Sequence, residues 1–118
     1  MTTITTINIK ALRVSEHAKR DRWTRITRCV EAVGGLGEVA FVCKSDRAKY
    51  AGNVVQIVTT TGLILVVDVE RNLLITGYLA SMRTTMGLYG SAGYHRMPNY
   101  VYKTVAYNER HLSHLYGI

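Results

Sequence analysis

A histidine, a carboxylate and two arginines share one side of a segment with helical spacing near the N-terminus. At about 100° per residue, Asp21, Thr24 and Arg28 fall within about 40° of His17 on the helical wheel, and Arg20 lies about 60° away. A histidine can transfer a proton near neutral pH, and arginines can hold a phosphate and stabilise the charge that develops on it. These residue types predict a site for phosphodiester chemistry.

The same residues have a simpler interpretation, because charged faces of helices are usually only solvated. Asp21 and Arg25 are four residues apart and can pair with each other. Arg25 lies at the edge of the polar face, where it could equally contact a phosphate. Arg20, Arg25 and Arg28 are therefore candidate nucleic-acid contacts, and the choice between binding and solvation stays open.

A second group of aromatic and basic residues surrounds a glycine-punctuated loop over residues 86–94. Tyrosines offer faces on which bases can stack, while arginine and histidine offer phosphate contacts. Glycine lets the backbone approach a ligand closely. The alternative is a hairpin loop whose tyrosines pack on the rim of a sheet. The candidate residues of this group are Tyr78, Arg83, Tyr89, Tyr94, His95 and Arg96.

The chain as a whole is basic. Fifteen Lys and Arg residues face eight Asp and Glu residues, giving a formal net charge of +7. Arginine, whose planar fork suits phosphate, outnumbers lysine, and most of the basic excess falls in residues 1–50. This balance predicts a nucleic-acid partner, with solubility as the alternative explanation of the charge.

The composition excludes several other classes of protein. Hydrophobic residues make up 47% of the 118 residues and charged residues 19%, which is typical of a globular chain and predicts a single domain over 1–118. The longest apolar runs, such as Leu63–Val67, are far shorter than the roughly 18–20 residues of a membrane span. Met1–Ile9 lacks the features of a signal peptide, so we expect a cytoplasmic protein in which Cys29 and Cys43 stay reduced.

The motifs predict neither a cofactor nor a metal. Gly34-Gly35-Leu36-Gly37 follows a helix rather than a strand and precedes no Gly-Lys-Ser/Thr, so it is not a dinucleotide or phosphate loop. His111 and His114 are three residues apart, but no acidic or cysteine partner with ligand spacing accompanies them.

The hydrophobic periodicity predicts an α+β fold, with an N-terminal helix, a four- or five-stranded antiparallel meander and a short C-terminal helix. The first helix begins at Ser15 and runs to Val33, and three glycines end it. Its apolar stripe is expected to cover one face of the sheet. The stripe consists of Trp23, Ile26, Cys29, Val30 and Val33.

The period then changes from 3.6 to 2, which predicts strands joined by short turns. A further strand is expected over Tyr100–Tyr107, after which Asn108 begins the short final helix carrying His111 and His114. The other four strands are expected over residues 39–43, 54–60, 63–69 and 73–79.

The order of elements resembles that of small RelE/ParE-like toxin relatives over about residues 12–80. Ser15-Glu16-His17-Ala18-Lys19 is similar to the His-Ala helix opening of that family, and Ile75-Thr76-Gly77-Tyr78 to the end of its second strand. The resemblance implies a ribonuclease-like fold in which His17 and Tyr78 lie opposite a phosphate held by Arg20, Arg28 or Arg83. Asp21 stands where the family has an arginine, which favours binding without catalysis.

The leading hypothesis is a basic, RelE-like nucleic-acid-binding protein that could act as a metal-independent endoribonuclease. In that reaction His17 would be the general acid or base, and Arg83 would stabilise the phosphate. Tyr78 would orient the RNA or donate a proton to it. The alternative is a small inhibitor or regulator of phage or mobile-element type that binds a host protein or its nucleic acid without catalysis. A third possibility is a homodimer formed through a sheet edge, either Val39–Cys43 or Tyr100–Tyr107.

Overall fold

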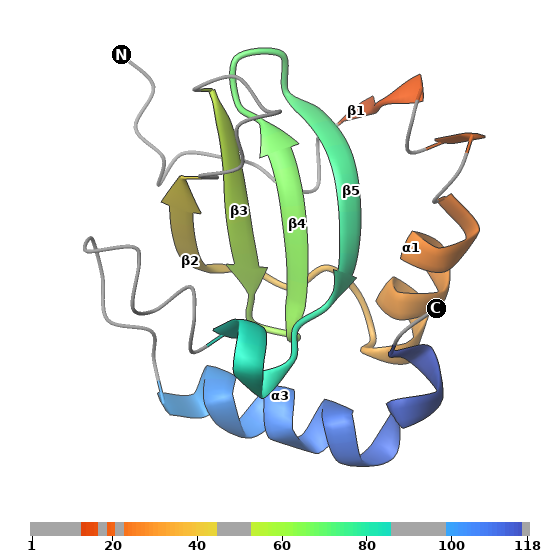
Figure 1. The fold of residues 1–118 in the computed structure, drawn as a ribbon, viewed down its shortest axis with the longest axis vertical. Helices are drawn as coiled ribbons and strands as arrows, with labels where there is room; N and C mark the ends of the chain where they lie inside the picture. The colour runs from red at the N-terminus through yellow and green to blue at the C-terminus, as the bar shows by residue number, and fades with distance from the viewer. Residues whose placement is uncertain (1–12, 17–18, 21–22, 45–52, 86–98, 117–118) are drawn as a thin grey trace.

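The computed structural model describes residues 13–16, 19–20, 23–44, 53–85 and 99–116, which form one sheet flanked by helices (Figure 1). The helices are α1 (Trp23–Ala32) and α3 (Asn99–His111), and a 3-10 turn, η4 (Ser113–Leu115), follows α3. The strands are β1 (Arg13–Val14), β2 (Val39–Lys44), β3 (Val54–Thr59), β4 (Leu63–Asp68) and β5 (Leu73–Leu79). Neither helix within these ranges has the length and hydrophobicity that a membrane crossing requires.

The central four strands form the predicted antiparallel meander. β2 pairs with β3, β3 with β4, and β4 with β5, all antiparallel and in chain order. The two turns on either side of β4 contain the residues that a tight turn requires, since Gly62 has φ +90° and Asn72 has φ +54°. The predicted strands and their turns are therefore confirmed.

The fifth strand is not the one that the sequence predicts. β1 comes from the segment before α1 and pairs in parallel with β5, placing Arg13 opposite Leu73 and Val14 opposite Leu74. The strand order is β1-β5-β4-β3-β2, so the sheet is mixed rather than wholly antiparallel. A parallel neighbour needs a long connection, and here α1 and three strands of the meander lie between β1 and β5 in the chain.

The C-terminal segment is a helix where the sequence predicts a strand. The run of tyrosine, valine and threonine over residues 100–107 favours a strand by composition, but Val101, Val105 and Asn108 are all buried at helical spacing. Asn108 lies inside α3 rather than at the start of a final helix, His111 ends α3, and His114 lies in η4. Tyr100–Tyr107 therefore provides no sheet edge for a dimer.

The glycines end α1 as expected. The Gly35 amide donates to the Val30 carbonyl at 2.9 Å and the Gly34 amide to the Glu31 carbonyl at 3.2 Å, which is the pattern of a Schellman cap. Gly34 has φ +84°, a conformation that other residues rarely adopt. The described helix begins at Trp23, later than predicted, although the Lys19 amide already donates to the Ser15 carbonyl at 2.9 Å.

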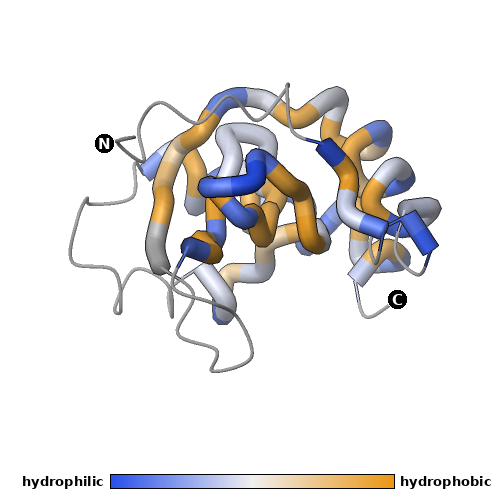
Figure 2. Tube along the Cα trace, turned by 90° about the horizontal axis from the view of Figure 1, so that it is seen from above, coloured by the Kyte–Doolittle hydropathy of each residue, from blue (hydrophilic) through white to orange (hydrophobic). Residues whose placement is uncertain are grey.

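Each face of the sheet has its own hydrophobic cluster because side chains alternate along the strands. Ile26 and Cys29 of α1 join the first face, with Leu63 and Leu65 of β4, as the predicted stripe requires, although Trp23 is 42% exposed. The second face carries the other cluster, in which α3 packs on the strands through Val101 and Val105, together with Phe41, Val58, Ile64 and Ala80. In Figure 2 the strands are largely hydrophobic, while hydrophilic segments alternate with hydrophobic ones along the peripheral helices.

A buried amide fixes α3 beneath the ends of the strands (Figure 1). Asn108 is 4% exposed, and its Nδ2 donates to the Thr61 carbonyl at 3.0 Å in the turn between β3 and β4. The next residue is Gly62, where an added Cβ would lie 2.5 Å from the same Nδ2. The sheet and α3 therefore meet at position 62, where only glycine fits. The opposite side of α3 faces outward.

Candidate nucleic-acid interface

Half of the residues predicted to form the site lie outside the described residues. These are His17, Tyr89, Tyr94, His95 and Arg96, with Asp21 of the predicted helix face. The described candidates are Tyr78 on β5, Arg83 in the helical turn over residues 82–85, Arg20 before α1, and Arg25 and Arg28 on α1.

The described candidates divide between the two faces of the sheet. Tyr78 is partly buried against the cluster that contains Val101 and Val105 of α3, whereas α1 packs through Ile26 on the other cluster. Arg28 is exposed on α1. The structure therefore does not bring Tyr78 together with the α1 arginines around one position.

Arg25 is partly buried beside the contact of α1 with β5. Burial raises the pKa of the Cys29 thiol, while a hydrogen bond with the Leu79 backbone and the positive charge of Arg25 offset part of the rise in this pKa. Arg25 thus has an electrostatic role at the helix–sheet contact. It is less available to a ligand than Arg20 and Arg28, which are exposed.

The outward side of α3 carries a different set of aromatic and basic residues. At about 100° per residue, five side chains fall within an arc of about 100°, and the buried residues Val101, Val105 and Asn108 lie on the other side of the helix. We call this surface the α3 outer face and define it by Tyr100, Lys103, Tyr107, Arg110 and His111.

The tyrosines of the α3 outer face are unusually open to solvent. Tyr100 is 52% exposed and Tyr107 is 61% exposed, and with Trp23 they are the large hydrophobic residues that the described structure leaves exposed. The ring of His111 lies against that of Tyr107, with centroids 4.2 Å apart and planes inclined by 35°. Exposed aromatic groups on one helix face are typical of an interaction surface.

The charge of this face is wholly positive because the acid of α3 is turned away from it. Glu109 is the only acidic residue of the helix, and it is partly buried, with its Oε1 accepting a hydrogen bond from the Met82 amide at 2.6 Å. Lys103 and Arg110 are exposed and have no carboxylate beside them on the outer face. Such a surface attracts a polyanion.

The hydrogen bond from Met82 to Glu109 also positions Arg83. The helical turn over residues 82–85 is capped by Ser81, whose Oγ accepts from the Thr84 amide at 3.0 Å. Arg83 is exposed on this turn and is therefore held beside α3. Of the predicted site residues, Arg83 is the one held beside α3, on the side of the helix to which Glu109 turns rather than on the α3 outer face.

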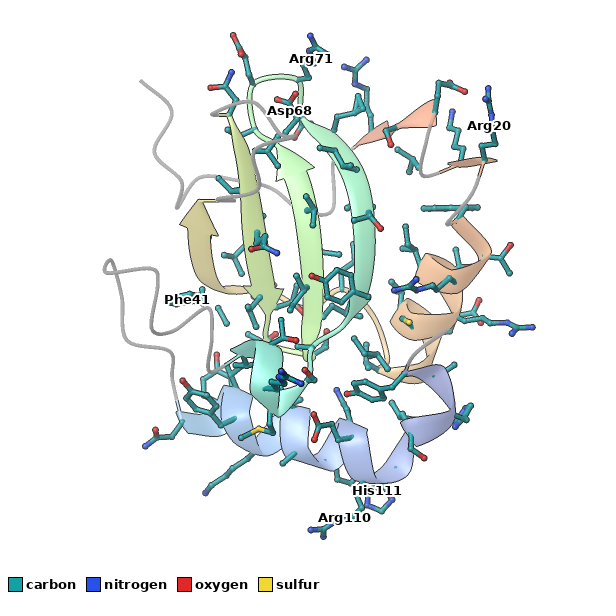
Figure 3. All side chains as sticks on the ribbon, in the orientation of Figure 1. Arg20, Phe41, Asp68, Arg71, Arg110 and His111 are labelled. Carbon is teal, nitrogen blue, oxygen red and sulfur yellow. The ribbon has the colours of Figure 1, made fainter. Side chains whose placement is uncertain are left out.

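Two of the basic residues at the other end of the molecule, Lys19 and Arg71, have acidic neighbours. Figure 3 shows Arg20 and Arg71 at the end of the long axis opposite to Arg110 and His111. Arg71 Nε lies 3.9 Å from Asp68 Oδ2, and Lys19 Nζ lies 4.0 Å from Glu16 Oε1. This end has mixed charge, so it is less suited to a polyanion than the α3 outer face.

The sequence pattern does not reveal the α3 outer face, because the composition of residues 100–107 favours a strand. The signal that identifies it is helical spacing, which is present in Tyr100, Lys103, Tyr107 and Arg110 at intervals of three and four residues.

Within the described ranges no three His, Cys, Asp or Glu side chains are grouped as a metal site would require. Comparisons of the chain with protein-family models, with curated proteins and with solved structures find no match.

Proposed function

We propose that this protein binds nucleic acid, RNA in preference to DNA, through the α3 outer face. The observation that carries the proposal is the presence of two exposed tyrosines and two exposed basic residues on one helix face, from which the only acid of the helix is turned away. Lysine and arginine contact phosphates, and aromatic rings contact bases.

Binding is favoured over catalysis by the distribution of the candidate residues. Tyr78 packs on the α3 side of the sheet while α1, with Arg25 and Arg28, packs on the other, so these arginines do not support a phosphate site around Tyr78. The RelE-like resemblance fits a nucleic-acid-binding protein that lacks cleavage, as Asp21 at an arginine position of the family also suggests. A cytoplasmic location accords with this proposal and with the free thiol of Cys29.

The proposal is tested by the salt dependence of RNA binding, measured by fluorescence anisotropy. For a single strand, the slope of log K against log salt is about −0.7 for each phosphate contact, so Lys103→Ala/Arg110→Ala should reduce the slope by about 1.4. Arg71→Ala is the matched control, because its side chain is 76% exposed at the opposite end of the molecule.

The control should bind with the wild-type slope. Absence of salt-dependent binding, or an equal loss in Arg71→Ala, would overturn the proposal.

The competing function is an inhibitor that binds a host protein, since tyrosine and arginine also dominate the hot spots of protein–protein interfaces. That function would be supported instead by one stoichiometric protein partner that is retained after nuclease treatment.

A further inference from the structure

We infer that the α3 outer face selects single-stranded nucleic acid by stacking bases on Tyr100 and Tyr107. This inference rests on the proposed function and names the form of nucleic acid that the same surface recognises. It is carried by the order of residues along the helix, by the exposure of the two rings and by the contact between Tyr107 and His111.

Aromatic and basic residues alternate along the α3 outer face. Tyr100, Lys103, Tyr107 and Arg110 follow one another at intervals of three, four and three residues, so the two tyrosines lie about 10.5 Å apart along the helix axis. Each tyrosine is followed by one cation. A single strand presents the same alternation of base and phosphate, so one strand running along the helix can satisfy both kinds of residue.

A duplex cannot use the tyrosine rings in this way. In double-stranded nucleic acid the faces of the bases are covered by their neighbours, and only base edges are accessible in the grooves. Lys103 and Arg110 would still contact phosphates, but the rings of Tyr100 and Tyr107 would find no unstacked base. The exposure of 52% and 61% for these rings therefore points to a ligand whose bases are unpaired.

His111 restricts the ring of Tyr107 before any ligand binds. The two rings are in contact at a centroid distance of 4.2 Å, yet Tyr107 remains the most exposed large hydrophobic residue described. One part of the ring is thus supported within the protein while most of its surface stays open. A platform held in this way loses less side-chain freedom when a base stacks on it.

The test compares the affinity of the protein for one sequence as a single strand and as a duplex, in both RNA and DNA, by fluorescence anisotropy at fixed salt. We expect the single strands to bind about tenfold more tightly than the duplexes, and each of Tyr100→Ala and Tyr107→Ala to weaken single-strand binding about tenfold. Tyr100→Phe and Tyr107→Phe should stay within about twofold of wild type, because they retain the rings.

Trp23→Ala is the matched control, since it removes an exposed aromatic side chain from α1 and leaves α3 intact. It should leave the affinity unchanged. Equal affinity for single strands and duplexes, or unchanged binding by both alanine variants, would overturn the inference while leaving the salt-dependent binding of the proposed function in place. Binding of neither form would overturn both. Stronger binding of the RNA strand than of the DNA strand would identify RNA as the source of the single strand.

Discussion

The ring of His111 lies against the ring of Tyr107, one turn earlier on the same helix, with the centroids 4.2 Å apart and the planes inclined by 35°. This contact joins the aromatic and basic parts of the α3 outer face. An aromatic pair of this kind contributes about 0.5–1.5 kcal/mol, and the lower end applies at an exposed site. The contact is therefore strong enough to bias the orientation of Tyr107.

His111→Ala should weaken single-strand binding by about two- to threefold, less than the removal of the Tyr107 ring itself, because it removes support rather than the platform. His114→Ala is the control, since His114 is exposed in η4, beyond the end of α3. Anisotropy titrations at one salt concentration measure the effect. Equal losses in the two histidine variants would show that charge near the helix end, and not the ring contact, sets the affinity.

Gly62→Ala should destabilise the fold more than Gly34→Ala. Both glycines have positive φ, +90° and +84°, so both substitutions strain the backbone by about 1–2 kcal/mol. The Cβ at residue 62 would in addition lie 2.5 Å from Asn108 Nδ2, whereas nothing lies within 4 Å of a Cβ at residue 34. Urea unfolding should show the excess cost as a lower midpoint, and equal midpoints would contradict the role given to Asn108.

Tyr116→Phe should cost about 1 kcal/mol near neutral pH, because the Tyr116 hydroxyl donates to the Ala80 carbonyl at 3.0 Å. Burial, followed by the charges of Glu109 and Cys29, raises the pKa of Tyr116 from 10.0 to about 12. A raised pKa means that the neutral form is favoured in the fold, so its contribution is complete below pH 10 and is lost as the pH rises from 10 to about 12.

The stability difference between wild type and Tyr116→Phe should therefore shrink over that alkaline range. Chemical unfolding of both proteins at several pH values measures it, and subtraction removes the titration of groups that the two share. A difference that is constant from pH 8 to pH 12 would contradict the assigned hydrogen bond and pKa.

RNA incubated with the protein in the presence of EDTA should be bound but not cleaved. The physical reason is that Tyr78 and the arginines of α1 belong to opposite faces of the sheet, so they do not meet around one phosphate. Gel analysis of the RNA, with Tyr78→Phe and His17→Ala in parallel, checks this expectation. Cleavage by the wild type that disappears in His17→Ala would establish the endoribonuclease instead.

The sequence was most informative where local signals and burial agree. β3 and β4 are nearly continuous β-branched and leucine runs separated by Thr61-Gly62, and the two strands pair as the predicted antiparallel hairpin. The helix ending at Gly34 and Gly35 follows from the same kind of local signal.

Residues 100–107 were not predictable from composition because tyrosine, valine and threonine favour strands, while the helix depends on tertiary packing. Val101 and Val105 are fully buried against the sheet, and Asn108 reaches a turn 47 residues earlier in the chain. Because residues 100–107 form a helix, the candidate site lies on α3 rather than on the N-terminal helix that the sequence favours. The charge of the chain predicts a phosphate-binding surface, and our choice of the α3 outer face rests on the direction of Glu109 and the exposure of Tyr100.

The most direct test of the account is to locate the interface by NMR, titrating the 15N-labelled protein with a single-stranded RNA of about 12 nucleotides. We predict that the largest amide shift changes fall on Tyr100, Lys103, Tyr107, Arg110 and His111. Changes centred on α1, around Arg25 and Arg28, with α3 unaffected, would contradict the central claim that the α3 outer face binds nucleic acid.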